Sequence, residues 1–191
     1  MKKIMIPLGC MAKFVMRDAQ WLKSEHITDI YSVSSCMSKD FTDWTGFWRH
    51  NGYWFFDSQS VIFEIAEEGR IDLKPATLFY YEGFDQEFAE ESGWRPYAPE
   101  PSFPLAVEVP EKRILRGYDV VCYYCGNSAG CSPLSCNALA DEIKVNEFCL
   151  LDSLETARAL LEGGRFKNSE PGPYRIIAVY TLNTGFEKGM Q

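Results

Sequence analysis

Apolar residues follow strand spacing in six runs of the chain. The clearest run is 174–182, where Ile176, Ile177 and Val179 stand close together. Residues branched at Cβ favour strands, and a nearly continuous apolar run is typical of a strand covered on both faces, so this run predicts a central strand. The other strands are predicted at residues 2–8, 31–35, 53–56, 77–81 and 118–124.

Apolar residues at helical spacing predict about four helices. They are expected at residues 11–25, 58–69, 133–143 and 152–163. Asp57 or Ser58 suits the N-cap of the second helix, and Asp152 with Glu155 resembles a capping box for the fourth. Gly69 favours the end of the second helix, because glycine adopts the left-handed conformation that often closes a helix.

The order of these elements predicts an α+β fold. Strand, helix and strand over residues 2–35 would form a β-α-β opening in which the two strands pair in parallel. Residues 82–110 hold five prolines and seven acidic residues, which is typical of a long surface excursion. A chain of 191 residues fits one hydrophobic core, so a single domain over residues 1–191 without internal repeats is expected. We predict one mixed or largely antiparallel sheet with about four helices packed on it.

The net charge of the chain indicates which classes of binding partner to expect. It carries 27 acidic and 19 basic residues, a formal net charge of −8. Such a field repels phosphate backbones and anionic lipid surfaces, so nucleic acid and membranes are poor partner choices. A basic protein is favoured instead, because complementary charge speeds association.

The cysteines indicate a reducing compartment, and the cytoplasm is the expected location. There are seven of them, and the chain has no Asn-x-Ser/Thr sequence, whereas secreted disulfide frameworks normally use an even number. The apolar stretch before Gly9-Cys10 superficially resembles a lipoprotein signal. It contains Pro7 and is shorter than the roughly 7 to 15 residues of a signal core, so no signal is expected.

Four cysteines gather near the middle of the second half of the chain. They are Cys122, Cys125, Cys131 and Cys136. Gly126 and Gly130 allow tight turns between them, and four thiolates satisfy the tetrahedral preference of Zn²⁺. The pattern therefore allows a structural zinc site, although its second spacing fits common zinc knuckles only loosely.

Two other interpretations of these cysteines stay open. Free cysteine is among the most buried residue types, so the side chains can simply fill the core. Alternatively, they are redox or nucleophilic thiols. Cys136 is the best placed for that role, because a helix that starts near Pro133 or Ser135 would put it in the first turn, where unpaired N–H groups favour a thiolate. We therefore expect Cys136 to be the most reactive cysteine.

The signals for an enzyme are weak. Cys36 follows a predicted strand, and His50 with a neighbouring aspartate could supply a base and its orienting partner. No Walker loop, dinucleotide fingerprint, zincin motif or hydrolase motif is present in the sequence. The sequence therefore favours a non-enzymatic function, although it does not exclude an enzyme.

Aromatic and acidic residues offer a candidate binding surface. The aromatic segment 41–56 is either core or a recognition surface. The acidic excursion is either a solvated loop or a docking face for a basic partner. The residues expected to bind are Trp44, Trp48, Arg49, His50, Trp54, Glu87, Glu90 and Glu91.

Two stretches carry a family resemblance. They are residues 131–137, with 117–121 before them and residues 145, 146, 149 and 150 after them, and the aromatic run 50–57. Both stretches are similar to a pattern in uncharacterised bacterial proteins of similar length, which have no assigned activity and therefore imply no site residues. A small, acidic protein without catalytic motifs is also similar in type to the immunity proteins that neutralise bacterial toxins by binding them.

Two functional hypotheses follow. The first is a non-enzymatic binding protein, an immunity-like inhibitor that occludes a basic protein partner and needs no cofactor. The alternative is a cysteine-cluster protein centred on residues 122–136, either a zinc-stabilised module or a thiol-dependent enzyme.

Overall fold

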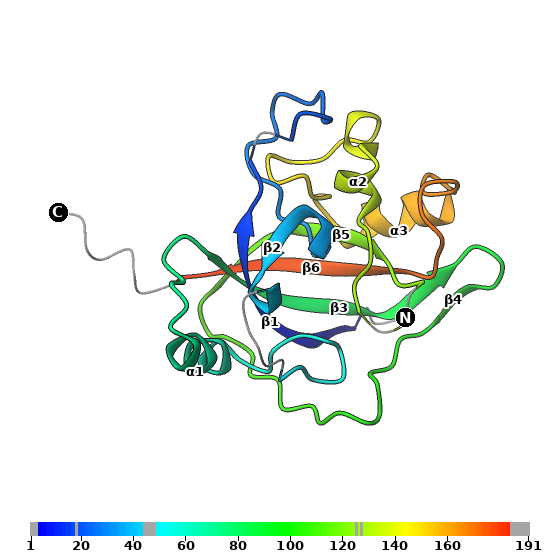
Figure 1. Cartoon of the computed structure of the whole chain (residues 1–191). Coiled ribbons are helices and arrows are strands. Elements are labelled where there is room, and N and C mark those ends of the chain that lie inside the picture. Colours follow the sequence, from blue (N-terminus) through cyan, green and yellow to red (C-terminus); the bar gives the residue numbers. More distant parts are fainter. Residues whose placement is uncertain (1–3, 18, 44–48, 125, 127, 184–191) are drawn as a thin grey trace.

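A computed structural model of the chain describes residues 4–183 except residues 18, 44–48, 125 and 127. Within these residues the protein forms one antiparallel sheet of six strands with three α-helices (Figure 1). The strands are β1 (Met5–Val15), β2 (Ser38–Asp40), β3 (Thr77–Ala89), β4 (Gly93–Pro96), β5 (Arg113–Cys122) and β6 (Tyr174–Leu182). The helices are α1 (Gln59–Gly69), α2 (Pro133–Cys136) and α3 (Leu154–Glu162). The predicted α+β fold with a largely antiparallel sheet is confirmed, but the described residues hold fewer α-helices than the four predicted.

The strand order is β2-β1-β3-β6-β5, and β4 pairs with the end of β3. β6 has the predicted bounds and lies between β3 and β5, which confirms its central position. β3 starts at the predicted residue but continues to Ala89, where it turns back into β4. The acidic excursion predicted for 82–110 is therefore wrong over its first part, which is a hairpin, and irregular only after β4.

The largest difference from the prediction lies near the N-terminus. Residues 11–15, expected to begin a helix, continue β1, which pairs antiparallel with β3 and places Lys13 opposite Thr77. Met11 and Ala12 are both buried, as in a strand covered on both faces. Apolar spacing alone does not separate such a strand from a helix, and pairing with a distant strand decides the outcome. The parallel β-α-β opening is wrong.

The predicted strands 31–35 and 53–56 are irregular segments instead. Phe56 forms a single bridge with Cys10 of β1, and several other backbone groups of these segments bond to side chains. Asn51 Oδ1 accepts hydrogen bonds from the backbone N–H groups of Tyr53 (2.9 Å) and Phe55 (3.3 Å). Within residues 31–35, the backbone carbonyl groups of residues 32–34 accept hydrogen bonds from the Nζ of Lys13.

Two of the helices begin at a serine cap. The Oγ of Ser58 accepts the N–H of Val61, as expected, while α3 is capped by Ser153 and not by Asp152. The predicted helix 133–143 divides into α2 and a 3-10 turn at Leu139–Asp141, because Ala138 between them has a left-handed φ of 56°. Within the described residues, no helix combines the length and apolar character needed to cross a membrane.

The two halves of the chain repeat one structural unit, so the prediction of a chain without internal repeats is wrong. Residues 51–58 read Asn-Gly-Tyr-Trp-Phe-Phe-Asp-Ser and residues 146–153 read Asn-Glu-Phe-Cys-Leu-Leu-Asp-Ser. The first stretch precedes α1 and the second precedes α3. We call each stretch an asparagine turn.

Most hydrogen bonds of the two asparagine turns have a counterpart in the other turn. Nδ2 of Asn51 donates to the Leu8 carbonyl of β1 (2.9 Å), and Nδ2 of Asn146 donates to the Arg116 carbonyl of β5 (2.7 Å). The Oδ1 of Asn146 accepts two backbone N–H groups, as that of Asn51 does. Each turn has one residue with a left-handed φ at its fourth position, 65° at Trp54 and 60° at Cys149.

The strands to which the two asparagine turns are hydrogen-bonded, β1 and β5, also match. β1 has a bulge at Gly9 and β5 has one at Gly117, both glycines with positive φ. A Cβ at Gly9 would lie 2.4 Å from the Phe56 carbonyl oxygen, and one at Gly117 would lie 2.8 Å from that of Leu151, so each turn requires a glycine at its strand. The pair β1 and β3 thus corresponds to β5 and β6, and the two half-sheets meet at the antiparallel β3–β6 pair.

Removing either asparagine should destabilise the fold. We expect Asn51→Ala to lower the free energy of unfolding by about 2 kcal/mol, because it leaves backbone groups of a buried turn unpaired. Asn146 is less buried, so Asn146→Ala should cost about 1 kcal/mol. Urea denaturation measures both, with the exposed Asn137→Ala as the control that stays close to wild type. A neutral Asn51→Ala would contradict this account of the turn.

Candidate functional site

The thiols of Cys36, Cys131 and Cys136 converge. Their Sγ atoms all lie within 4.8 Å of one another, and those of Cys36 and Cys131 are 3.7 Å apart. Cys36 ends the serine loop (residues 32–36), and the other two belong to the cysteine loop (residues 128–136). Each loop lies between the first strand of a half and its asparagine turn, so both halves of the chain contribute to this thiol cluster.

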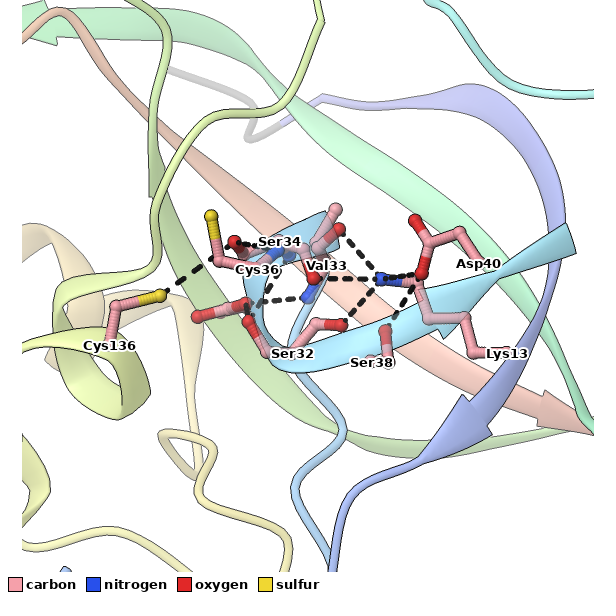
Figure 2. Close-up of polar contacts among 9 residues, drawn as sticks. Lys13, Ser32, Val33, Ser34, Cys36, Ser38, Asp40 and Cys136 are labelled. Atoms are coloured by element: carbon pink, nitrogen blue, oxygen red, sulfur yellow. Dashed lines mark hydrogen bonds and ion pairs between the residues drawn. The ribbon is translucent and has the colours of Figure 1, made fainter. Parts of the chain in front are cut away.

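Lys13 on β1 fixes the serine loop from inside the protein (Figure 2). Its Nζ donates to the carbonyl groups of Ser32 (2.9 Å), Val33 (2.8 Å) and Ser34 (3.2 Å) and forms an ion pair with Asp40 (3.3 Å). The Lys13 side chain is only 2 % exposed. A buried ammonium group requires such partners, so three consecutive carbonyl groups are turned toward it. This requirement shapes the serine loop.

Asp119 on β5 joins the two loops. Its buried carboxylate accepts hydrogen bonds from Ser32 Oγ (3.1 Å) and the Val33 N–H (2.8 Å) of the serine loop, and from Ser132 Oγ (2.6 Å) of the cysteine loop. Burial raises the pKa of Asp119 above its ordinary value, although the three hydrogen bonds act in the opposite direction. One carboxylate therefore sets the positions of the residues on both sides of the thiol cluster.

The cysteine loop folds back on the end of β5. Cys122 donates its backbone N–H to the Cys131 carbonyl (2.9 Å), and its Sγ accepts the Cys131 N–H (3.0 Å). One turn later, the Cys136 N–H bonds the Ser132 carbonyl (2.7 Å), and Cys136 Sγ lies 3.7 Å from Ser34 Oγ (Figure 2). The loop thus aims Cys131 and Cys136 at the serine loop.

The three thiols differ in access to solvent. Cys36 is exposed, whereas Cys131 and Cys136 are half-buried. Burial raises the pKa of the Cys136 thiol, and α2 consists of a single turn. The low pKa expected for Cys136 at a helix start is therefore wrong. Burial, the contact with Cys36 and the neighbouring Cys136 also raise the pKa of Cys131.

The cysteines named from the sequence have different places. Cys131 and Cys136 lie in the thiol cluster, and Cys125 lies outside the described residues. Cys122 is buried in the apolar core and serves the loop as a hydrogen-bond acceptor. Cys36 joins the cluster from 95 residues before Cys131, and no local spacing connects the two in the sequence.

Three of the five residues expected on the aromatic part of a binding surface are described by the structure, namely Arg49, His50 and Trp54. Trp44 and Trp48 lie outside the described residues. His50 stacks on Trp54, with ring centroids 4.0 Å apart, and Arg49 forms an ion pair with Glu64 (3.3 Å). The His50 ring is thus packed against aromatic rings.

The acidic residues expected to bind divide into two groups. Glu87 is buried and forms ion pairs with Arg95 (2.7 Å) and Arg175 (2.9 Å), so its carboxylate is already paired with two arginines of the same chain. Glu90 and Glu91 line an open cleft that Glu170 also lines. Binding of a basic partner stays a prediction, and this cleft is where it would be sought.

A cavity of about 290 Å³ is bounded by both loops. Val33 and Ser35 of the serine loop line it, as do Ser128 and Ala129 of the cysteine loop. Trp54 with its left-handed backbone forms another part of the wall. A link between Cys36 and Cys131 would therefore tie two walls of this cavity together.

Comparison of the chain with protein-family models, curated proteins and solved structures gives no match. What the thiol cluster does is therefore inferred from its own chemistry. Three thiols at this spacing suit two kinds of reaction, coordination of a soft metal ion and thiol–disulfide exchange.

Proposed function

We propose that the protein binds a soft divalent metal ion, zinc in the first place, through the thiolates of Cys36, Cys131 and Cys136. The observation that carries the proposal is the convergence of three Sγ atoms within 4.8 Å. A Zn–S bond of about 2.3 Å gives a tetrahedron whose sulfur atoms are about 3.8 Å apart. The 3.7 Å between Cys36 and Cys131 Sγ is close to that edge. Small side-chain rotations would bring Cys136 to the same separation.

The surroundings support coordination. Lys13 and Asp119 hold the loops through buried bonds, so the ligands are positioned before a metal arrives. Among the described residues, the three thiols supply three corners of a tetrahedron, and the fourth is left for a further ligand, either water or another residue. A metal held here would join the two halves of the chain and stabilise the folded state, because the unfolded chain lacks the site.

Cobalt binding to the reduced chain tests this proposal. We expect Co²⁺ to give the strong absorption bands of tetrahedral thiolate coordination, and Zn²⁺ to displace it. Cys131→Ser should weaken binding by more than the about 10- to 100-fold that loss of an outer partner costs. The matched control is Cys149→Ala, which removes a buried thiol that is not part of the cluster and should leave the cobalt spectrum unchanged.

The affinity should also depend on pH with a defined sign. Thiolates are the ligands, and the pKa values of Cys131 and Cys136 are raised, so a metal must displace protons that these thiols hold firmly. Affinity should therefore rise as the pH increases from about 6 to about 8. Absence of thiolate bands across this range, or bands that persist unchanged in Cys131→Ser, would contradict the proposed site.

A further inference from the structure

We propose that Cys36 and Cys131 form a reversible disulfide by exchange with a small disulfide such as oxidised glutathione, and that Cys36 is the thiol that reacts first. This reaction uses side chains of the proposed metal site, but it does not require that a metal binds. It adds an exchange activity, with a low-molecular-weight disulfide as its substrate class, at the junction of the two halves of the chain.

Access sets the order of the two thiols. Cys36 is the exposed member of the thiol cluster, at the end of the serine loop, so a disulfide arriving from solvent meets its Sγ first. Its backbone N–H is bound by Ser34 Oγ (3.1 Å), which holds the 3-10 turn at Ser35–Met37 in place. Cys131 lies half-buried behind it. Cys36 is therefore the attacking thiol and Cys131 the resolving one.

Distance favours closure between these two cysteines. Their Sγ atoms are 3.7 Å apart, whereas a disulfide bond is about 2.05 Å long, so the two sulfur atoms need to approach each other by only about 1.7 Å. Cys136 is held differently, because its Sγ lies 3.7 Å from Ser34 Oγ as a hydrogen-bond donor. Geometry therefore favours a disulfide between Cys36 and Cys131.

The exchange proceeds in two balanced steps. The sulfur of Cys36 attacks one sulfur of the small disulfide, whose S–S bond breaks, and one half leaves with the proton that Cys36 lost. The sulfur of Cys131 then attacks Cys36 Sγ, the mixed S–S bond breaks, and the second half leaves with the proton from Cys131. The two protein thiols are oxidised by two electrons, and the small disulfide is reduced to two thiols. Excess small thiol reverses both steps.

The disulfide would affect both the proposed metal site and the cavity beside it. A disulfide between Cys36 and Cys131 would consume two of the three thiols that the proposed metal site needs. It would also tie together the serine loop and the cysteine loop, which both line the cavity. Oxidation and metal binding would therefore exclude each other.

Mass spectrometry of the full chain, reduced and freed of metal by a chelator, tests the proposal with oxidised glutathione as the probe. The expected product has lost the mass of two hydrogen atoms, and its peptide map joins Cys36 to Cys131. Cys131→Ser should stop at a mixed disulfide with glutathione on Cys36. Cys36→Ser should acquire no glutathione at Cys131 over the same time, and Cys149→Ala, which lies outside the thiol cluster, should behave as wild type.

Two outcomes would overturn the proposal. One is a wild-type chain that keeps all its thiols after exposure to oxidised glutathione, and the other is a peptide map that joins a different pair. The wild-type map suffices even where a variant folds poorly, which circular dichroism reveals. Cobalt binding is measured separately, so an active thiol pair without cobalt bands would reject the metal site alone, and the reverse result would reject the exchange alone.

Discussion

Replacing Lys13 by methionine is expected to lower the free energy of unfolding by about 3 to 5 kcal/mol, the range found when one partner of a buried ion pair is removed. Methionine fills similar space, so the effect does not come from a cavity. It comes from Asp40, which loses its buried cationic partner, and from the three carbonyl groups of the serine loop, which lose their donor. Urea denaturation followed by tryptophan fluorescence measures the change.

A neighbouring lysine provides the control for this prediction. Lys39 lies on β2 next to Asp40 but is exposed, so Lys39→Met should change stability by no more than about 0.5 kcal/mol. The serine loop should also loosen in Lys13→Met, and its amide protons should exchange with solvent faster than those of β6. A Lys13→Met chain as stable as Lys39→Met would show that the buried ammonium does not hold the loop.

Lys13 also explains why the start of the fold could not be predicted. A lysine among apolar residues at helical spacing indicates the solvent face of a helix, whereas here it is a buried residue of a strand. Its partners are carbonyl groups about 20 residues away, and no local pattern reports them. By contrast, β6 and α1 were predicted closely, because apolar runs and caps act over a few residues, although the left-handed residue that closes α1 is Arg70 and not Gly69.

The internal repeat was missed for a related reason. The two asparagine turns share three identical residues, Asn, Asp and Ser, and otherwise conserve only the apolar character of some positions. The equivalence rests on backbone geometry, namely the glycine bulges that receive each turn and the left-handed residue within it. Sequence spacing between these parts also differs, because the loops that carry the cysteines differ in length. The match is therefore visible in the backbone conformation and the hydrogen bonds and not in the sequence spacing.

The candidate site was predictable in part. Cys131 and Cys136 belong to a local cluster of thiols, which any count of cysteine spacings finds. Cys36 enters from the other half of the chain, and its place depends on Lys13 and Asp119, two buried charges whose partners are distant in sequence. Among the described residues, tertiary contacts of this kind add a cysteine from a second loop to the two that the local cluster supplies.

Asp119→Ala is expected to lower the free energy of unfolding by about 3 kcal/mol and to weaken cobalt or zinc binding by about 10- to 100-fold. The variant leaves the buried Val33 N–H without its acceptor and removes the acceptor of Ser32 and Ser132, so both loops lose their common anchor. Metal affinity falls because the thiols are then no longer held close together. Urea denaturation and cobalt titration measure the two effects on the same sample.

The pH dependence of this destabilisation has a sign that follows from burial. Burial raises the pKa of Asp119 in the folded chain, so the folded state holds the Asp119 proton at a higher pH than the unfolded state does. The contribution of Asp119 to stability is therefore fully present below the unfolded pKa and decreases as the pH rises through the folded pKa. Asp119→Ala should accordingly cost more near pH 4 than near pH 7, within the range where both chains fold.

Ser132→Ala, which removes one of the three donors and keeps the carboxylate, should cost only about 1 kcal/mol. An Asp119→Ala chain that binds cobalt like wild type would show that the thiol cluster forms without this anchor.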